Sequence, residues 1–418
     1  MPTVPKLLFV SPVFPDITGY GLAMRAGAIL EGLSASCQVY LLIIPIHDPY
    51  RAALSPRVRP WCRQYCVIRA SKLRNRMVRL GGMLQRMSTQ PSRPSEWRYA
   101  SGRMIYKAAQ AFQDIRFDYL HVFRLYMTPY AMPYLHTQKH LTACYLDLDD
   151  VESSTRRRLA DLYRANGLYT QARREQQAAD MYVGLERELL PRFDGIYVCS
   201  RQDKNQLNTQ VSGQNVFVLP NVIRLPSGSR PAKSGGPFTF LFVGNLAYYP
   251  NEDAVAYFLE HVLPCLRQRA KRPFCLTVIG SGQSRRLRHY RQIPEYRYLG
   301  CVSELAPYYD QADAVVVPLR AGGGTRIKVL EAFSFKRPVV STTLGVEGLE
   351  VDHEKHILIA DRPQHFAEQC CRLMEDKQLS ATLTANAFVC LVAHYTQEAM
   401  QRTLSRIMLG NSPGAARA

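Results

Sequence analysis

Short, uninterrupted runs of apolar residues alternate along this chain with longer segments in which apolar residues recur every three or four positions. The run at 6–11 reads KLLFVS and the run at 37–46 reads CQVYLLIIPI, with the amphipathic segment LAMRAGAILEGL between them. Continuous apolar runs of this length are typical of strands buried on both faces, and the segment between them is typical of a helix. The order strand, helix, strand predicts a parallel sheet covered by helices.

The same pattern continues to residue 360. We predict further strands at 117–122, 141–150, 193–200, 215–221, 238–245, 274–282, 296–302, 313–319, 338–340 and 356–360. The segments between them predict helices, among them one or two long helices in 153–190 and single long helices in 251–269 and 379–409.

A segment rich in Pro, Gly and Ser, LPSGSRPAKSGGP at 225–237, separates two halves that each show this pattern. A chain of 418 residues is long enough for two domains of roughly 200 residues each. We therefore predict an α/β fold of two Rossmann-like, doubly wound parallel-sheet domains facing an interdomain cleft. The predicted parts are a first domain at 1–224, the linker at 225–237, a second domain at 238–390, a helix crossing back at 391–409 and a tail at 410–418.

Composition narrows the class of protein. Hydrophobic residues make up 47% of the chain and charged residues 21%, which is typical of a globular protein in water. The longest apolar runs fall short of the ~20 residues of a membrane-spanning helix, and the N-terminus lacks a signal-peptide pattern, so we expect a cytoplasmic location. The eleven cysteines are scattered without zinc-site spacing, and we interpret them as reduced thiols.

The net charge of +19 is concentrated in one predicted insertion, residues 51–110. This segment holds fourteen lysines and arginines against one acidic residue, Glu96, and aromatic and methionine side chains are interleaved with the charges. Such a surface suits anionic lipid headgroups or nucleic acid, although a solvated basic face without a partner is the alternative. We favour docking to an anionic membrane, at the inner face of the plasma membrane, or to an acidic glycan acceptor, and expect no nucleic acid.

The stretch VVVPLRAGGGTRIKVLEAFSFKRPVVST at 315–342 predicts a strand, a glycine-rich turn, a helix and a second strand. Gly323 and Gly324 let a ligand approach the backbone closely, and Thr325 can cap the helix. Arg326 and Lys328 lie in the first helical turn, where positive charge is unfavourable unless an anion is bound there. The alternative is an ordinary βαβ turn with surface charge.

Other candidate residues follow the ends of predicted strands, where ligands of open α/β sheets bind. In the first half, His121 lies near one strand end, and Asp149 and Asp150 follow another, where they can contact an acceptor hydroxyl or cap the next helix; a metal site is less favoured. The first loop lacks the G-x-G-x-x-G spacing of dinucleotide binders, which argues against a nicotinamide-dependent oxidoreductase. It offers Gly19, Tyr20 and Gly21 as a phosphate or sugar contact.

Several motifs in order resemble the C-terminal domain of the family 4 glycosyltransferases of the GT-B fold. They are FVGNLAYYPNEDAVAYFLEHVLP, VIGSG, YLGCVSELAPYYDQADAVVVPLRAGGGTRIKVLEAFSFKRPVVSTTLGVEGL and ILIAD. The similarity is strong over 238–405 and extends more weakly to the first half through SPVFPDITGYGLAMR, DYLHV and FDGIYVCSRQD.

The resemblance implies a retaining transferase that moves a sugar from a nucleotide-diphosphate donor to an acceptor hydroxyl, in glycan, polysaccharide or glycolipid biosynthesis. It implies no metal and no cofactor beyond the nucleotide sugar. The implied donor contacts are Glu331 to the ribose, Gly323 and Gly324 to the sugar or diphosphate, Gly280, Cys301 and Val302 to the base, Gly21 to the diphosphate and His121 near the sugar.

Two departures from the family pattern stand out. The first glutamate of the paired-glutamate motif falls at Gly323, and the Arg and Lys that often follow the first strand of this domain are replaced by GNLAYYPNED, with Gly244 and Asn245. We expect Arg326 and Lys328 to supply the missing positive charge, since a subset of the family combines GGGTR-K with PN in this way. A sugar-nucleotide epimerase on the same fold and a non-catalytic membrane or nucleic-acid binder are the alternatives.

Overall fold

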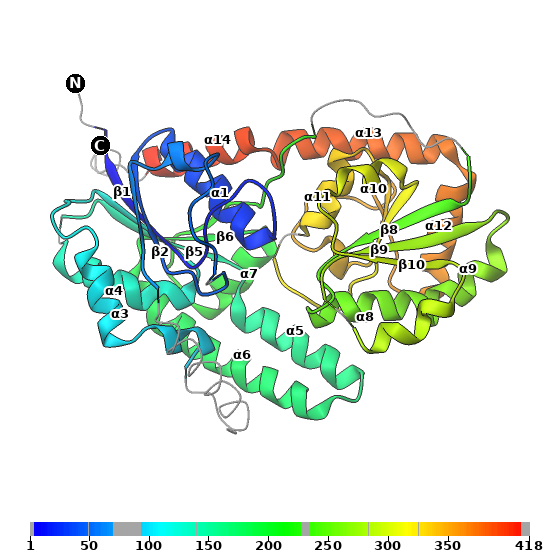
Figure 1. The fold of residues 1–418 in the computed structure, drawn as a ribbon, viewed down its shortest axis with the longest axis horizontal. Coiled ribbons are helices and arrows are strands. Elements are labelled where there is room, and N and C mark those ends of the chain that lie inside the picture. The colour runs from blue at the N-terminus through cyan, green and yellow to red at the C-terminus, as the bar shows by residue number, and fades with distance from the viewer. Residues whose placement is uncertain are drawn as a thin grey trace. The chain divides into compact units, whose positions relative to one another are not determined.

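The computed structural model describes residues 4–48, 50–69, 93–138, 140–226, 235–282, 284–324 and 326–410. The chain forms two compact units, Met1–Asn221 with Gln397–Ala418, and Val222–Thr396 (Figure 1). The first unit thus ends at Asn221, and the chain returns to it at Gln397. From the sequence we expected the first domain to end at residue 224 and the returning helix to begin at residue 391. Three predicted segments lie partly outside the described residues: the basic insertion at 70–92, the linker at 227–234 and the tail at 411–418.

In the described part of the first unit, seven parallel strands form one sheet in the order β3-β2-β1-β4-β5-β6-β7. The strands are β1 (Lys6–Ser11), β2 (Gln38–Ile43), β3 (Gln64–Val67), β4 (Tyr119–Phe123), β5 (Ala143–Asp149), β6 (Gly195–Val198) and β7 (Val216–Val218). The sequence pattern predicted all of them except β3. That edge strand is four residues long and only partly buried, so it carries too little apolar sequence to be recognised.

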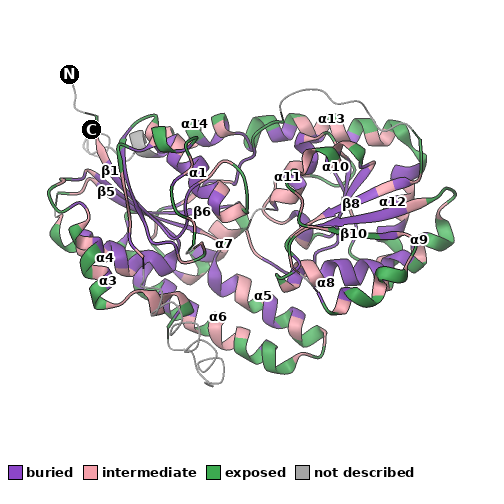
Figure 2. Cartoon of the chain, viewed as in Figure 1, coloured by how far each residue is buried: buried purple, intermediate pink, exposed green. Residues whose placement is uncertain are grey.

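Helices cover the sheet of the first unit. They are α1 (Gly21–Ser34), α3 (Gly102–Gln110), α4 (Thr128–Thr137), α5 (Glu152–Ala165), α6 (Tyr169–Leu189), α7 (Arg201–Gln210) and α14 (Gln397–Gly410), with short 3-10 turns η1 (Arg59–Trp61), η2 (Ser95–Tyr99), η3 (Leu125–Met127) and η4 (Leu190–Arg192). Burial follows the strands and the inner faces of these helices (Figure 2).

The described part of the second unit contains a six-stranded parallel sheet in the order β10-β9-β8-β11-β12-β13. The strands are β8 (Phe238–Val243), β9 (Phe274–Ile279), β10 (Tyr296–Gly300), β11 (Ala314–Val317), β12 (Val339–Ser341) and β13 (Leu358–Ile359). The helices are α8 (Tyr249–Tyr257), η5 (Phe258–Val262, a π turn), α9 (Leu263–Arg269), η6 (Arg286–Gln292), α10 (Ala306–Gln311), α11 (Ile327–Ser334), η7 (Leu344–Val346), α12 (Pro363–Glu375) and α13 (Lys377–His394).

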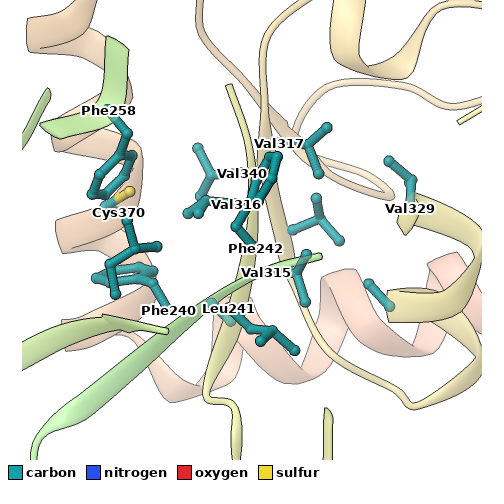
Figure 3. Packing of buried hydrophobic residues seen from close by; sticks show 14 of the residues in the cluster. Phe240, Leu241, Phe242, Phe258, Val315, Val316, Val317, Val329, Val340 and Cys370 are labelled. Carbon is teal, nitrogen blue, oxygen red and sulfur yellow. The ribbon is translucent and has the colours of Figure 1, made fainter. Parts of the chain in front are cut away.

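The core of the second unit explains why its strands read as continuous apolar runs. Val329 of α11 packs on one side of the strands, and Phe258 and Cys370 lie on the other (Figure 3). Strand residues such as Val316 and Phe242 are therefore covered whichever face they point to, and both are 1% exposed. The prediction of two doubly wound parallel-sheet domains is confirmed.

The predicted long helix at 379–409 is wrong, because the chain leaves the helical path between α13 and α14. Tyr395 is 1% exposed, and its hydroxyl accepts a hydrogen bond from the Glu350 N–H at 2.6 Å. Its carbonyl accepts another from the Ile223 N–H at 2.9 Å. These bonds anchor the residue in the second unit just before the chain returns to the first.

None of the helices in the described ranges is long and apolar enough to span a bilayer.

Candidate functional site

The strand order of the second sheet marks the place where a ligand is expected. The chain passes from β8 outward to β9 and β10, then returns to the other side of β8 with β11, β12 and β13. Such a reversal of direction creates the ligand crevice of open α/β sheets, outside the carboxyl ends of the two central strands. Gly244 follows β8 there, and the glycine turn 322–324 follows β11.

The glycine turn presents unused hydrogen-bond donors. Gly322 and Gly324 have φ values of 129° and 69°, a region that favours glycine. Among the residues that the structure describes, the N–H groups of Gly323 and Gly324 have no hydrogen-bond partner. The next helix, α11, begins after Arg326 with no side-chain cap, and the predicted cap, Thr325, lies outside the described residues. The turn and the helix start together suit an anion.

Arg326 supports this turn from within the protein. Its guanidinium Nη1 donates to the Gly323 carbonyl at 2.5 Å and its Nε donates to the Leu344 carbonyl at 3.1 Å. Its Nη2 lies 3.9 Å from Oε2 of Glu347, and the side chain is only 7% exposed. The sequence predicted that this charge faces a ligand phosphate. The observed hydrogen bonds instead join the glycine turn to the segment at η7.

Lys328 is better placed than Arg326 to bind a ligand. Its Nζ donates to Oδ1 of Asn251 at 2.8 Å and lies 4.2 Å from the centroid of the Phe242 ring. Burial, together with the nearby Arg326 guanidinium, lowers the pKa of Lys328 to about 7. An ammonium group has three donors, so the contact with Asn251 leaves donors for a bound anion.

Glu331 lies one turn further along α11. Its Oε2 accepts a hydrogen bond from the Tyr309 hydroxyl at 2.8 Å, and burial raises the pKa of the carboxyl group. Tyr309 is fully buried and stacks on the Phe335 ring with centroids 4.8 Å apart, so its hydroxyl has a fixed position. Among the described residues Oε1 of Glu331 has no hydrogen-bond partner, and it can therefore accept a bond from a ligand hydroxyl. No local sequence signal identified Tyr309.

The predicted base-side residues surround the loops after β8, β9 and β10. A Cβ at Gly280 (φ 156°) would lie 1.8 Å from the Gly244 carbonyl oxygen, so a glycine at 280 allows the loops after β8 and β9 to pack backbone against backbone. Asn245 closes its own turn, since its Oδ1 accepts the Ala247 N–H at 2.9 Å. Cys301 is exposed and Val302 is half-buried directly after β10.

A third cation, which the sequence analysis missed, follows β11. Arg320 forms a two-point ion pair with Asp253 of α8, with Nη2–Oδ1 at 2.6 Å and Nε–Oδ2 at 2.9 Å. Asp253 is fully buried while the Arg320 side chain is 30% exposed. The position of an arginine just after the apolar run VVVPL was the available signal.

In the first unit, the loop after β1 leads into the open start of α1. Gly19 has a φ of 107°, and Tyr20 is the N-cap residue, 45% exposed and without a side-chain capping bond. Gly21 is the first helical residue. The helix start therefore offers backbone N–H groups, and the contact with a phosphate or sugar stays a prediction.

His121 does not lie near the end of its strand, which corrects the expected position. It pairs with Phe9 and Tyr145 in the middle of β4 and is completely buried. Burial and the Arg25 charge lower its pKa to about 3, so the imidazole is neutral. Neither ring nitrogen has a hydrogen-bond partner among the described residues, and Nε2 lies 4.0 Å from Asp147 Oδ2. The strand continues one residue beyond the run FDYLHV, to Phe123, so two strand residues follow His121.

Charged side chains gather where β4 and β5 end. Asp147 is fully buried and holds Arg25 of α1 through two hydrogen bonds of 3.1 Å. Asp149 accepts a bond from Nη1 of Arg124 at 3.1 Å. Arg124 and Asp149 have φ values of 77° and 57°, which are costly for residues with a Cβ, and such strain often accompanies functional sites.

Asp150 is the carboxylate of this cluster that lies furthest from a cation. Its Oδ2 is 3.9 Å from Arg124 Nη1, and its side chain is 24% exposed. Burial and the neighbouring Asp149 raise its pKa to about 7. The alternative that these aspartates cap the next helix is wrong, because α5 begins after Val151 without a side-chain cap.

Comparison with known proteins identifies the family that the second unit matches. Residues 237–376 match the family model described as glycosyl transferases group 1. The second unit is a group 1 glycosyltransferase domain. A Klebsiella pneumoniae protein, described as an uncharacterized 44.6 kDa protein in cps region, is 26% identical over 163 residues, which is 37% of this chain and 42% of that protein.

Solved structures show that the glycosyltransferase domain and the first unit together have the GT-B fold. Sucrose-phosphate synthase from Thermosynechococcus elongatus is similar with a TM-score of 0.67 and 15% identity, covering 97% of this chain and 98% of that one. Anabaena HepE in complex with UDP-glucose is similar with a TM-score of 0.64 and 13% identity, covering 97% and 100%. At these identities the similarity concerns the fold.

Proposed function

We propose that this chain is a retaining glycosyltransferase that uses a nucleotide-diphosphate sugar as donor and an acceptor hydroxyl as the receiving group. The observation that carries this proposal is the set of donors at the strand reversal of the second sheet. The N–H groups of Gly323 and Gly324, which have no partner among the described residues, are suited to a diphosphate, as are the uncapped start of α11 and the Lys328 ammonium. HepE, which shares the fold, binds UDP-glucose.

The chemistry requires charge stabilisation more than acid catalysis. The bond between the anomeric carbon and the diphosphate oxygen breaks, and a bond from that carbon to the acceptor oxygen forms on the same face. The departing phosphate oxygen takes the acceptor proton. Fixed N–H donors and one cation stabilise the negative charge that grows on the diphosphate, and the proposed mechanism uses no metal ion.

The remaining candidates have supporting roles in this proposal. Glu331, held by Tyr309, accepts a hydrogen bond from a ribose hydroxyl, while Gly280, Cys301 and Val302 border the base. In the first unit the start of α1 contacts phosphate, and Asp149 and Asp150 accept hydrogen bonds from acceptor hydroxyls. The full burial of His121 argues for a structural role in place of the predicted contact with the donor sugar.

A donor panel tests this function. We expect hydrolysis or transfer with at least one of the UDP-, GDP- and dTDP-sugars, and release of the sugar with its anomeric configuration retained, as read by proton NMR. The Lys328→Ala variant serves as the matched negative control. Failure of every donor to bind or react contradicts the proposal. Conversion of the sugar to its epimer without transfer identifies the epimerase alternative instead.

We further propose that the enzyme works on a membrane-linked acceptor in glycan, polysaccharide or glycolipid synthesis at an anionic membrane surface. On α3, Arg103, Tyr106 and Lys107 are exposed at helical spacing, and Arg57 and Arg63 are exposed elsewhere in the basic insertion.

Liposome sedimentation tests this membrane contact. Binding to vesicles that contain phosphatidylserine is expected to weaken as salt rises from 0.05 M to 0.5 M, values on the order of those over which screening becomes strong. A double variant Arg103→Ala/Lys107→Ala is expected to bind less than the wild type. Binding that is unchanged by salt, or equal on neutral vesicles, contradicts an electrostatic membrane contact.

A further inference from the structure

Two sequence motifs that stand 77 residues apart meet in the glycosyltransferase domain. Asn251, from the PN motif at the start of α8, accepts the hydrogen bond of Lys328, from the GGGTRIK motif. We propose that Asn251 is a positioning residue, which holds the Lys328 ammonium in place for the donor diphosphate. This inference rests on the proposed function, because it names the residue that orients the lysine proposed to bind the diphosphate.

The partners of Asn251 determine the orientation of its amide. Lys328 can only donate, so the atom facing it must be the amide oxygen; the Asn245 carbonyl can only accept, so the amide nitrogen faces it, at 2.9 Å. The side chain thereby ties the loop after β8 to α11. Gly244 provides the space, since a Cβ at this position would lie 2.9 Å from Cγ of Asn251.

The Lys328 ammonium is held from two directions. The Phe242 ring lies 4.2 Å from Nζ and is itself 1% exposed in the core, so it cannot move aside. Asn251 lies at 2.8 Å as a hydrogen-bond acceptor. Four side-chain torsions of lysine are thus restrained before a ligand arrives, which lowers the ordering cost of binding.

An amide suits this task better than a carboxylate. A carboxylate at 251 would form an ion pair with Lys328 and neutralise the charge that the diphosphate needs. An amide oxygen accepts the hydrogen bond and leaves the full positive charge for the ligand. The charged groups that act on Lys328 are Arg326, just before α11, which lowers the pKa of Lys328, and Glu331, within α11, which raises it.

A double-mutant cycle on UDP binding and on kcat/KM for the donor tests the proposal. Asn251→Ala is expected to weaken both by about tenfold, the size of one lost hydrogen bond to a charged group. In the Lys328→Ala background the same change is expected to have no further effect, within about twofold, because the residue acts through the lysine. An equal loss in both backgrounds overturns the positioning role.

The matched control is Asn386→Ala, which also removes an amide bound to a backbone carbonyl in the same unit, Lys355, at 2.9 Å. We expect UDP affinity to be unchanged in this variant.

The pH profile of the Asn251→Asp variant provides a second measurement, which would not change if Asn251 had only a structural role. The variant keeps the acceptor oxygen and adds a negative charge beside Lys328, so the alkaline limb of the pH profile of kcat/KM should move to higher pH. A limb that stays in place overturns the proposal. If none of UDP, GDP and dTDP binds to the wild type, the proposed function fails; if a nucleotide binds and the cycle is additive, only the role of Asn251 fails.

Discussion

Replacing Lys328 by alanine is expected to lower kcat/KM for the nucleotide-sugar donor by about 10²- to 10³-fold, the usual cost of removing one donor aimed at developing negative charge. Arg326 cannot compensate, because its guanidinium is bound to the carbonyls of Gly323 and Leu344. The measurement is steady-state turnover of the donor identified in the panel. Activity within about threefold of the wild type would overturn the assignment of the diphosphate charge to Lys328.

Lys336→Ala is the matched control for this prediction. Lys336 follows the other end of α11 and also lies over an aromatic ring, 4.8 Å from the centroid of Phe388. Its replacement removes the same kind of contact from the same unit, away from the glycine turn. We expect turnover to be unchanged, which separates loss of charge at the site from loss of a cation–π contact.

The same residue predicts the pH dependence of donor use. The pKa of Lys328 in the free protein is lowered to about 7, so the ammonium is charged below this pH and loses its proton above it. Because the diphosphate needs the charged form, kcat/KM should be level on the acidic side of this group and fall as the pH rises through about 7. Lys328→Arg, which stays charged, should abolish this limb; an identical limb in that variant would assign it to another group.

Replacing Arg25 by methionine is expected to destabilise the first unit by about 3 to 5 kcal/mol, because it leaves the Asp147 carboxylate buried without its cation. Both side chains of this pair are 0% exposed. Arg25 also donates to the Leu219 carbonyl and to Oδ1 of Asn221, each at 3.0 Å, so those acceptors lose a partner as well.

Tryptophan fluorescence in urea measures this effect selectively. The chain has two tryptophans, Trp61 and Trp97, and both belong to the first unit, so their signal follows its unfolding. Arg164→Ala is the control, since its ion pair with Asp161 is 51% and 60% exposed and is expected to contribute little. Arg25→Met/Asp147→Asn should recover part of the loss. A loss below about 1 kcal/mol in Arg25→Met would contradict the importance of the buried pair.

The sequence by itself determined that the chain forms two parallel sheets covered by helices, and where the glycine turn lies. Apolar runs such as VVVPL and FTFLFV predict strands buried on both faces, because a strand covered by helices on each side has no polar face to show. Gly323 and Gly324 after such a strand predict a turn with free N–H groups. Buried strands and the glycine turn depend on residues that are adjacent in the sequence, so the local sequence pattern reveals them.

Only the tertiary structure decided which side chains meet. Asn251 and Lys328, Tyr309 and Glu331, and Arg25 and Asp147 are each far apart in the chain, and their contacts depend on strand order and on how helices pack. For the same reason the sequence misplaced His121: in a strand that is apolar on both faces, nothing local shows which position is the last one buried. Long-range packing, which local periodicity does not encode, therefore turned the Arg326 guanidinium toward the carbonyls of Gly323 and Leu344 and placed the Lys328 ammonium beside Asn251.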